Sequence, residues 1–368
     1  MHIPDGYLSP QTCIAAYAVA VPTLAVASRR VTSVVRTRNV PLLATFSATS
    51  FLIMMFNVPI PDGTTAHAVG GAIIAIVLGP WAAVIAVSVA LLFQALLFGD
   101  GGVLAYGANV VNMAIILPFV ALGVYRLVAG KSPLTARRRV FAAALGGYAG
   151  INAAALATAV EFGLQPGLFH TTAGVPLYSP YHLSEAIPAM MFAHLTVAGA
   201  AEAILTGGVL GYLVRADIRR LVPNHPGIPL TDDAVVPAAS RWSPGRVAAA
   251  AVVAMTLLTP LGLLAPGGAF GEDAPEDLDL GSLGLDAIPT GLARYDGFWS
   301  RTLLGDYGFA DGGNATVAYW LSALVGIAVV GATVYLIARA VSALTGRGEP
   351  PDGGPSRPAE ATAPSSSG

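Results

Sequence analysis

The stretch AHAVGGAIIAIVLGPWAAVIAVSVALLFQ, residues 66–94, contains no charged side chain. An apolar helix of about 20 residues is long enough to cross the hydrocarbon core of a bilayer. This stretch is longer than one crossing requires, and Gly79-Pro80-Trp81 interrupts it, so we interpret it as two shorter helices joined by a tight turn. Its apolar residues are continuous rather than alternating, which favours helices over the strands of a membrane β-barrel.

Composition points to the same class of protein. Of the 368 residues, 55% are hydrophobic and 11% are charged, and the mean hydropathy is +0.67. Soluble domains carry about 25% charged residues. In lipid, every backbone polar group must be hydrogen-bonded within the protein, which leaves helices and closed barrels as spanning structures. The sequence therefore predicts an all-α integral membrane protein of the lipid bilayer, and we expect no nucleic-acid partner.

Nine apolar segments predict a seven-helix bundle plus two additional transmembrane helices. The bundle comprises residues 10–28, 40–60, 66–94 (counted as two helices), 103–127, 140–161 and 185–214. The additional helices are residues 247–265 and 317–340. We expect a membrane domain at 1–220, a cytoplasmic linker at 221–246, a two-helix part at 247–340 with an outer loop at 266–314, and a disordered Pro/Gly/Ser-rich tail at 341–368.

The distribution of basic residues predicts the orientation, because Lys and Arg accumulate in cytoplasmic loops. With the N-terminus outside, every Lys and Arg falls on the cytoplasmic side except Arg294 and Arg301. We therefore expect a multi-pass protein of the cell membrane that is N-out and C-in. No basic region precedes the first apolar run, so we expect no signal peptide and expect Met1 to remain the N-terminal residue.

The first two residues offer three nitrogen atoms to a metal ion. Met1 has an α-amine, and His2 has its amide nitrogen and an imidazole. Coordination by these atoms forms fused five- and six-membered chelate rings and favours a Lewis-acidic ion of tetragonal preference, such as Ni²⁺ or Cu²⁺. His67 can provide the fourth nitrogen, because the predicted topology puts it on the same outer side. The sequence thus predicts an extracytoplasmic metal site made of Met1, His2 and His67.

Each histidine also has an ordinary explanation. A histidine at position 2 is usually a solvated terminal residue, and a histidine near a helix start, as expected for His67, is usually a surface or capping residue. Their predicted co-location, in a chain with six histidines, favours the metal site. The orientation that brings them together comes from the arginines and not from the histidines themselves.

Three segments carry a family resemblance. They are MHIPDGYLSP (residues 1–10), VPIPDGTTAHAVGG (58–71) and LLFQALLFGDGGVLAYGANVVNMAIILPF (91–119). Together they resemble the CbiM/NikM family, the substrate-capture subunits of energy-coupling-factor transporters for cobalt and nickel. The resemblance implies a seven-helix bundle whose N-terminus folds back into an outward-facing pocket. It also implies a roughly square-planar site formed by Met1, His2 and His67.

The C-terminal part resembles a different protein of the same transporters. The segments LLTPLGLLAPGGAFGED (residues 257–273) and GFWSRTLLGDYGF (297–309) are similar to the small two-helix CbiN/NikN partner, here fused to the bundle. This likeness implies a role in loading the pocket. No GxxxxGK[ST] motif is present, so we expect ATP hydrolysis on separate ATPase subunits, joined through a transmembrane coupling subunit.

Three polar residues are candidates for supporting the metal site from outside it. Asp5, in the turn Pro4-Asp5-Gly6, can bond to backbone or to His67, or it can be an ordinary helix cap. Asn109 and Asn112 can orient a ligand imidazole or the N-terminal loop. Interhelical hydrogen bonding is an equal alternative for both asparagines.

A second polar group lies on the seventh predicted helix, where His194, Glu202 and Thr206 share one face. Intramembrane ionisable residues suggest function by default. Because they lie progressively deeper toward the cytoplasmic end, we interpret them as packing or coupling residues and not as metal ligands. The nine acidic residues of the outer loop can raise the local cation concentration, although an ordinary solvated loop is the stronger interpretation.

The sequence favours a substrate-binding membrane subunit of an importer of Ni²⁺ or Co²⁺, with the ion as transported ligand, no cofactor and no enzymatic activity of its own. Square-planar geometry favours nickel. One alternative is an intramembrane metalloenzyme, although no HExxH motif is present. Another is a carrier of an organic micronutrient, which requires an apolar pocket of several hundred Å³.

Overall fold

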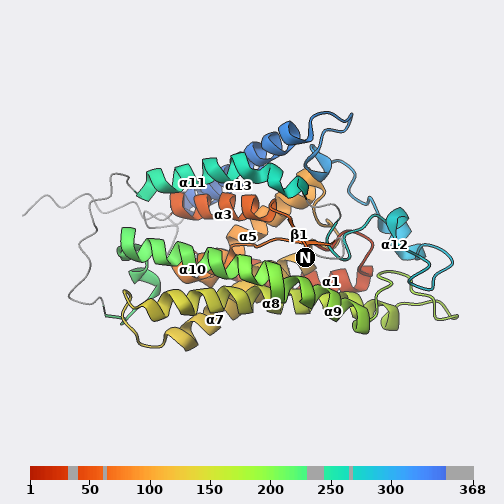
Figure 1. Cartoon of the computed structure of the whole chain (residues 1–368), viewed down its shortest axis with the longest axis horizontal. Helices are drawn as coiled ribbons and strands as arrows, with labels where there is room; N and C mark the ends of the chain where they lie inside the picture. Colours follow the sequence, from red (N-terminus) through yellow and green to blue (C-terminus); the bar gives the residue numbers. More distant parts are fainter. Residues whose placement is uncertain (32–39, 61–63, 230–243, 265–267, 345–368) are drawn as a thin grey trace, which may run out of the picture.

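The computed structural model describes residues 1–31, 40–60, 64–229, 244–264 and 268–344. Most long helices run side by side along the longest dimension of the molecule (Figure 1). The N-terminal part contains α1 (Pro10–Arg30), α3 (Val40–Met54), α4 (Gly71–Leu78), α5 (Pro80–Phe93), α6 (Tyr106–Asn109), α7 (Leu117–Ala129), α8 (Arg137–Leu168), α9 (Leu183–Ala193) and α10 (Gly199–Ala216). The C-terminal part contains α11 (Pro244–Leu258), α12 (Thr290–Tyr295) and α13 (Ala315–Leu344).

Three π-helical segments extend α-helices or join them into longer units. They are η1 (Gln94–Phe98), which continues α5, η2 (Val110–Ile116), which joins α6 to α7, and η3 (His194–Ala198), which joins α9 to α10. Single π-helical turns of this kind are frequent at functional sites. The remaining 3-10 turns are η4 (Ile218–Arg220), η5 (Val222–Asn224), η6 (Thr259–Leu264), η7 (Pro275–Asp277) and η8 (Gly305–Tyr307).

Within the described residues, seven helical units are long and apolar enough to cross a bilayer. They are Pro10–Arg30, Pro80–Phe98, Tyr106–Ala129, Arg137–Leu168, Leu183–Ala216, Gly245–Leu264 and Ala315–Ala340. The prediction of an all-helical membrane protein is confirmed at this level. The other two predicted segments form helices of 15 residues (α3) and 8 residues (α4).

The boundaries around His67 differ from the prediction. The segment predicted as helix 40–60 ends at Met54 and continues into β1 (Val58–Pro59), which pairs antiparallel with β2 (Thr65–Ala66). The next helix begins at Gly71 and not at Ala66, because Gly70 adopts a left-handed conformation with φ of 76°. His67 therefore precedes the helix in an irregular segment. The predicted turn at 61–63 lies outside the described residues.

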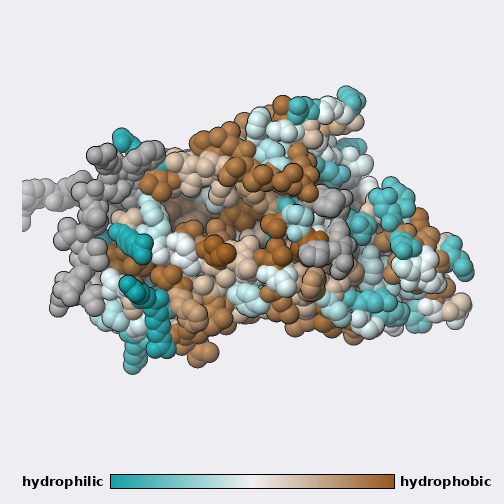
Figure 2. Space-filling model, viewed as in Figure 1, coloured by the Kyte–Doolittle hydropathy of each residue, from teal (hydrophilic) through white to brown (hydrophobic). Residues whose placement is uncertain are grey.

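The surface of the bundle agrees with a lipid environment. Figure 2 shows hydrophobic side chains over the helical middle of the molecule and hydrophilic side chains at both ends of its long dimension. On α1, for example, Ile14, Val19 and Val21 are exposed. Apolar side chains on the outside of a helical bundle remain in contact with water unless lipid covers them, which is unfavourable. This pattern therefore fits a protein surrounded by lipid.

Small residues bring the central helices close together. A Cβ atom at Gly146 or Gly150 of α8 would lie 2.6 Å from the carbonyl oxygen of Ala121 or Leu117, respectively. Two glycines four residues apart on one helix allow backbones to approach in this way. The result is a tight contact between α8 and the unit formed by η2 and α7.

The outer segment (residues 268–314) folds back on one end of the bundle, near the N-terminus (Figure 1). The Trp299 indole N–H donates to the carbonyl oxygen of Leu96 over 2.8 Å, and the amides of Leu303 and Leu304 donate to that of Leu97 over 2.8 and 3.0 Å. The last carbonyls of a helix have no partner within it. The outer segment therefore completes the end of the α5–η1 unit.

Candidate metal centre

The N-terminal segment (residues 1–9) is inside the protein and not in solvent. Met1, His2 and Ile3 are 3%, 2% and 0% exposed. The amide of Ile3 donates to Oδ1 of Asn109 over 2.8 Å, and Nδ2 of Asn109 donates to the carbonyl of Ile3 over 3.1 Å. This reciprocal pair fixes the main chain directly after His2.

Asp5 holds the segment from the other side. Its carboxylate accepts hydrogen bonds from the amides of Val103, Leu104 and Ala105 over 3.1, 2.7 and 3.2 Å. These amides lie directly before α6, and N–H groups at the start of a helix have no carbonyl partner within that helix. Burial raises the pKa of the Asp5 carboxyl, and the three amides oppose that shift. Of the two sequence alternatives, Asp5 bonds to backbone and not to His67.

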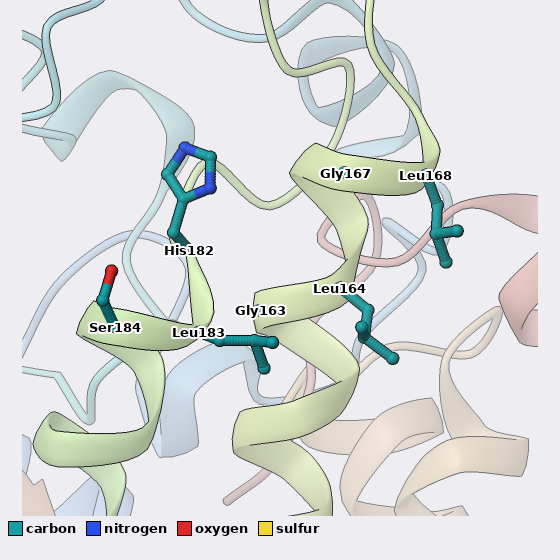
Figure 3. A pocket seen from close by; sticks show the side chains of 7 residues that line it. All are labelled: Gly163, Leu164, Gly167, Leu168, His182, Leu183 and Ser184. Carbon is teal, nitrogen blue, oxygen red and sulfur yellow. The ribbon is translucent and has the colours of Figure 1, made fainter.

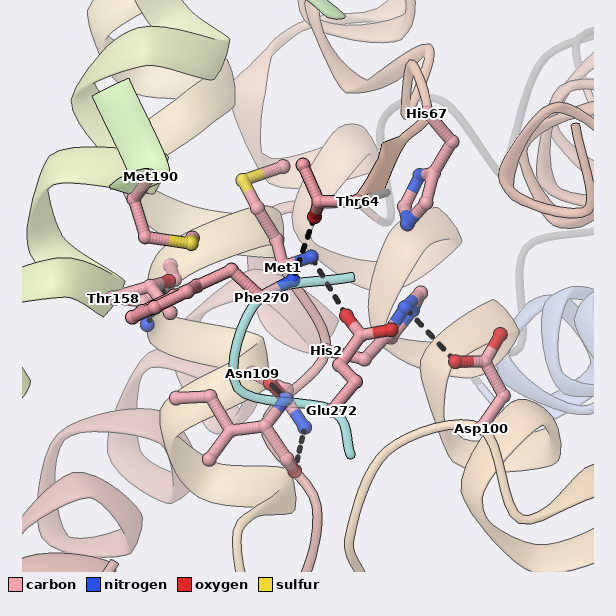
Figure 4. Close-up of polar contacts among 12 residues, drawn as sticks. Met1, His2, Thr64, His67, Asp100, Asn109, Thr158, Met190, Phe270 and Glu272 are labelled. Carbon is pink, nitrogen blue, oxygen red and sulfur yellow. Dashed lines mark hydrogen bonds and ion pairs between the residues drawn. The ribbon is translucent and has the colours of Figure 1, made fainter. Parts of the chain in front are cut away.

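The two imidazoles predicted to share a metal lie against each other. The rings of His2 and His67 are stacked with centroids 5.0 Å apart and an interplanar angle of 29°. His2 and His67 are both buried, and among the described residues Nε2 of each has no hydrogen-bond partner. Two buried and unpartnered nitrogens are costly unless a further ligand binds them. Figure 4 shows these rings beside Met1.

His67 has the protonation state that a metal donor requires. Its Nδ1 is 3.0 Å from the carbonyl oxygen of Ala68. A carbonyl can only accept, so Nδ1 carries the proton and Nε2 carries the lone pair. Burial lowers the pKa of His67 well below its ordinary value, and the charges of His2 and the N-terminal amine act in the same direction. The imidazole is therefore neutral.

Two carboxylates bind nitrogen atoms of the N-terminal segment that are proposed metal donors. The α-amine of Met1 donates to Oε1 of Glu272 over 2.9 Å, and Nδ1 of His2 is 3.0 Å from Oδ1 of Asp100 (Figure 4). A six-membered chelate ring with the His2 amide requires Nδ1 of that residue. The structure thus has the amine and the imidazole in place, but Nδ1 must leave Asp100 before the predicted chelate closes.

Asp100 is itself held by other residues. Its Oδ2 accepts from the hydroxyl of Tyr307 and from Nε2 of Gln94, the latter over 3.1 Å. Gln94 also donates to the Tyr307 hydroxyl over 3.1 Å. Tyr307 and Glu272 both belong to the C-terminal part. The C-terminal part therefore contacts Met1 directly and contacts His2 through Asp100.

Side chains alone do not form a metal site in the described ranges of the chain, which contain no group of three or more His, Cys, Asp or Glu residues suited to one ion. The proposed donor set depends instead on main-chain nitrogens of Met1 and His2, together with the two imidazoles. The unpartnered Nε2 of His67 beside the N-terminus fits that set.

The sequence is similar to known families of proteins. Residues 2–219 match CbiM, the cobalt uptake substrate-specific transmembrane region. The chain belongs to the CbiM family. The chain is 48% identical to the fused nickel transport protein NikMN of Rhodobacter capsulatus, over 94% of this chain and 99% of that protein. It is 42% identical to the probable fused nickel transport protein LarMN of Lactiplantibacillus plantarum, over 89% and 95%.

A solved structure supports the same assignment. The crystal structure of a truncated transition metal transporter is 60% identical to this CbiM chain, with a TM-score of 0.54, and covers 58% of this chain and 98% of that one. The family resemblance seen in the sequence is thus confirmed. CbiM proteins are transport proteins, so this chain is not an enzyme.

Asn112, the other candidate asparagine, contacts α8 and not the N-terminal segment. Its Nδ2 donates to Thr158 Oγ1 over 3.1 Å and to Glu161 Oε2 over 2.6 Å. These are interhelical hydrogen bonds, the alternative considered from the sequence. Its recorded contacts do not reach the imidazoles.

Three residues around the site were not assigned to it from the sequence: Asp100, Glu272 and Tyr307. The signal for Asp100 was present, because it is an acid in the family motif of a chain with few charges. Glu202 was noticed but assigned to packing or coupling. Glu272 is one of nine acids in the outer loop, and nothing in the sequence separates it from the others.

One cavity lies away from these residues. It has a volume of about 430 Å³ and is an open hollow between the end of α8 and the start of α9 (Figure 3). Its lining residues are Gly163, Leu164, Gly167, Leu168, His182, Leu183 and Ser184. A smaller cavity of about 220 Å³ borders the loop next to His2, and Asp5, Gly101, Asp296 and Asp306 are among its lining residues.

Proposed function

We propose that this chain is the substrate-binding membrane subunit of an ATP-driven importer of Ni²⁺ or Co²⁺, with nickel favoured. The observation that carries the proposal is the buried and unpartnered Nε2 of His67, whose ring is stacked on that of His2 beside the α-amine of Met1. The names of two similar proteins refer to nickel. A set of nitrogen donors suits both ions, and the tetragonal preference of an amide donor favours Ni²⁺.

The ion is held by the amine of Met1, the amide nitrogen and Nδ1 of His2, and Nε2 of His67. All four must be free of protons when they bind, so metal binding releases protons. In the structure Glu272 and Asp100 hold the amine and the imidazole of the N-terminal segment. Metal binding exchanges these carboxylate contacts for coordination.

The fused C-terminal part assists loading of the site. Glu272 contacts Met1 directly, and Tyr307 contacts Asp100, which in turn contacts His2. A displacement of the outer segment would free the amine of Met1 and would release Asp100, the partner of His2, from Tyr307. This supports the separate roles of a metal-capture domain at 1–220 and a two-helix part at 247–340.

The orientation is N-out and C-in, with nine crossings and the metal site on the extracytoplasmic side of the cell membrane. Seven of the nine are the long helical units, and the other two are α3 and the irregular segment from Thr64 together with α4. ATP is hydrolysed by separate ATPase subunits, and a transmembrane coupling subunit joins them to this chain. The metalloenzyme and the organic-solute carrier receive no support from a family of metal transport proteins.

The test is metal titration of the purified full-length chain with Ni²⁺, Co²⁺, Cu²⁺ and Zn²⁺, followed by absorption spectroscopy. We expect one Ni²⁺ per chain and the spectrum of low-spin, four-nitrogen Ni²⁺. Acetylation of the α-amine of Met1 removes the first nitrogen donor, so it should abolish that spectrum. Unchanged binding by the acetylated protein would refute the N-terminal chelate.

A further inference from the structure

Glu202 is a carboxylate inside the helical bundle that the proposed coordination does not use. It lies on α10 and is fully buried. α8 approaches closely here, because a Cβ atom at Gly147 would lie 3.0 Å from the carbonyl oxygen of Glu202. A carboxylate in such surroundings requires strong hydrogen bonds. Its partners therefore indicate what it does.

Those partners are backbone amides directly after His67. Oε2 of Glu202 accepts from the amide of Val69 over 2.8 Å and from that of Gly70 over 2.9 Å. Gly70 is the N-terminal cap of α4 and offers no side chain of its own for capping. Helix N-termini leave N–H groups unpaired and attract negative charge. Glu202 thus caps α4 from a different helix.

A second helix holds the same peptide from the opposite direction. The hydroxyl of Ser50, on α3, donates to the carbonyl oxygen of Val69 over 2.7 Å. The His67 turn (residues 64–70) is therefore fixed two residues after His67 by both α10 and α3. Because Nδ1 of His67 bonds to the carbonyl of Ala68, the ring orientation follows the placement of this turn.

We propose that Glu202 is a positioning residue that fixes Nε2 of His67 relative to the N-terminal donors and thereby sets the affinity and geometry of the metal site. The inference rests on the proposed function, since it concerns the same ion. Glu202 does not touch the metal. It acts through the main chain of Val69 and Gly70, and its effect reaches the metal only through His67.

Two substitutions separate position from charge. Glu202→Gln loses the charge but keeps an oxygen at the same distance, which can accept from both amides. Glu202→Asp keeps the charge but withdraws the oxygens by one methylene group. Leu210→Ala, two turns further along α10 and also fully buried, disturbs the same helix without removing a hydrogen bond of Glu202.

The experiment is NiCl2 titration of each full-length variant, with the absorption spectrum of bound Ni²⁺ and the thermal unfolding midpoint recorded. We expect Glu202→Asp to weaken affinity by about 10- to 100-fold, the usual effect of losing an outer-sphere contact of a metal ligand, and to alter the spectrum. Glu202→Gln should retain the wild-type spectrum, and Leu210→Ala should retain both affinity and spectrum. If Glu202→Gln loses the spectrum while Glu202→Asp keeps it, charge and not position is what matters, and the inference is wrong.

The wild-type protein and His67→Ala make the two proposals distinguishable. If wild-type protein binds no Ni²⁺ or Co²⁺, the proposed function fails. If wild-type protein binds, His67→Ala weakens binding and Glu202→Asp does not, the function stands and only the role of Glu202 is overturned. A fall in affinity for Leu210→Ala equal to that of Glu202→Asp also overturns it, because general disturbance of α10 would then explain both.

Discussion

The two segments that provide the proposed metal donors are held in different ways. The His67 turn is fixed through its main chain by Glu202 and Ser50, both on helices of the bundle. The donor atoms of the N-terminal segment are instead held by the side chains of Glu272 and Asp100. Carboxylate contacts to donors can be exchanged for metal, whereas main-chain contacts beside a donor persist when metal binds. The His67 turn thus keeps its position, whereas the donor atoms of the N-terminal segment can change partners.

The largest effect should come from removing the donors. His2→Ala removes the imidazole of the chelate and should abolish high-affinity Ni²⁺ binding, and His67→Ala should weaken it by more than about 100-fold, above the range for outer-sphere residues. Isothermal titration of the purified chain measures both. His170→Ala, in an exposed loop, is the control. Equal wild-type affinity in both variants would remove the basis of the comparison.

A substitution that detaches the N-terminal segment without touching a donor should come next. A Cβ atom at Gly102 would collide with the carboxylate and the amide nitrogen of Asp5. Gly102→Ala and Asp5→Ala should each weaken Ni²⁺ affinity by about 10- to 100-fold, because the supporting contacts of a donor are lost. Gly123→Ala, where nothing lies within 4 Å, is the matched control. Wild-type affinity in Gly102→Ala would mean that Asp5 does not set the position of His2.

The two asparagines sharpen the same comparison. Asn109→Leu breaks the reciprocal pair with Ile3 and should weaken Ni²⁺ affinity by about tenfold, the lower end of the range for outer-sphere residues. Asn112→Leu breaks bonds to α8 only and should leave metal affinity unchanged while lowering the thermal unfolding midpoint. Metal titration and thermal unfolding of both variants provide the check. A larger loss of affinity in Asn112→Leu would contradict the structure.

The smallest expected effect is a gain in Ni²⁺ affinity and not a loss. Glu272 competes with the ion for the amine of Met1, so Glu272→Gln should tighten equilibrium Ni²⁺ affinity by about two- to fivefold, as expected for a partly exposed ion pair. Glu276→Gln removes an exposed charge from the same outer segment and serves as the control. Weaker binding by Glu272→Gln alone would indicate that Glu272 assists the bound state and does not compete with it.

Much of the molecule follows from its sequence because membrane helices satisfy their hydrogen bonds locally. Length and apolarity are enough to recognise such helices, and the arginines add an expected orientation. The pairing of His2 with His67 also came from the sequence, although through topology and family motifs. The position of His67 before α4, and not on a helix, required the conformation of Gly70, which residue identity alone does not fix.

The contacts that arrange the site could not be predicted, because they join residues far apart in the chain. Glu272 meets Met1 across 271 positions, and Tyr307 meets Asp100 across 207. Glu202 was visible as an intramembrane acid, but its partners are main-chain amides, which carry no signature in a sequence. Asn109 and Asn112 were indistinguishable until the structure showed which of them faces the N-terminal segment.

The hydrogen bonds of Trp299, Leu303 and Leu304 to the end of η1 have a consequence for assembly. They dock the outer segment on the bundle within one polypeptide, and a tether keeps such a segment at an effective local concentration of about millimolar. A docking contact that would be too weak to capture a separate subunit from dilute solution can therefore still be occupied most of the time. It can also dissociate quickly, so fusion permits rapid opening and closing without loss of the partner.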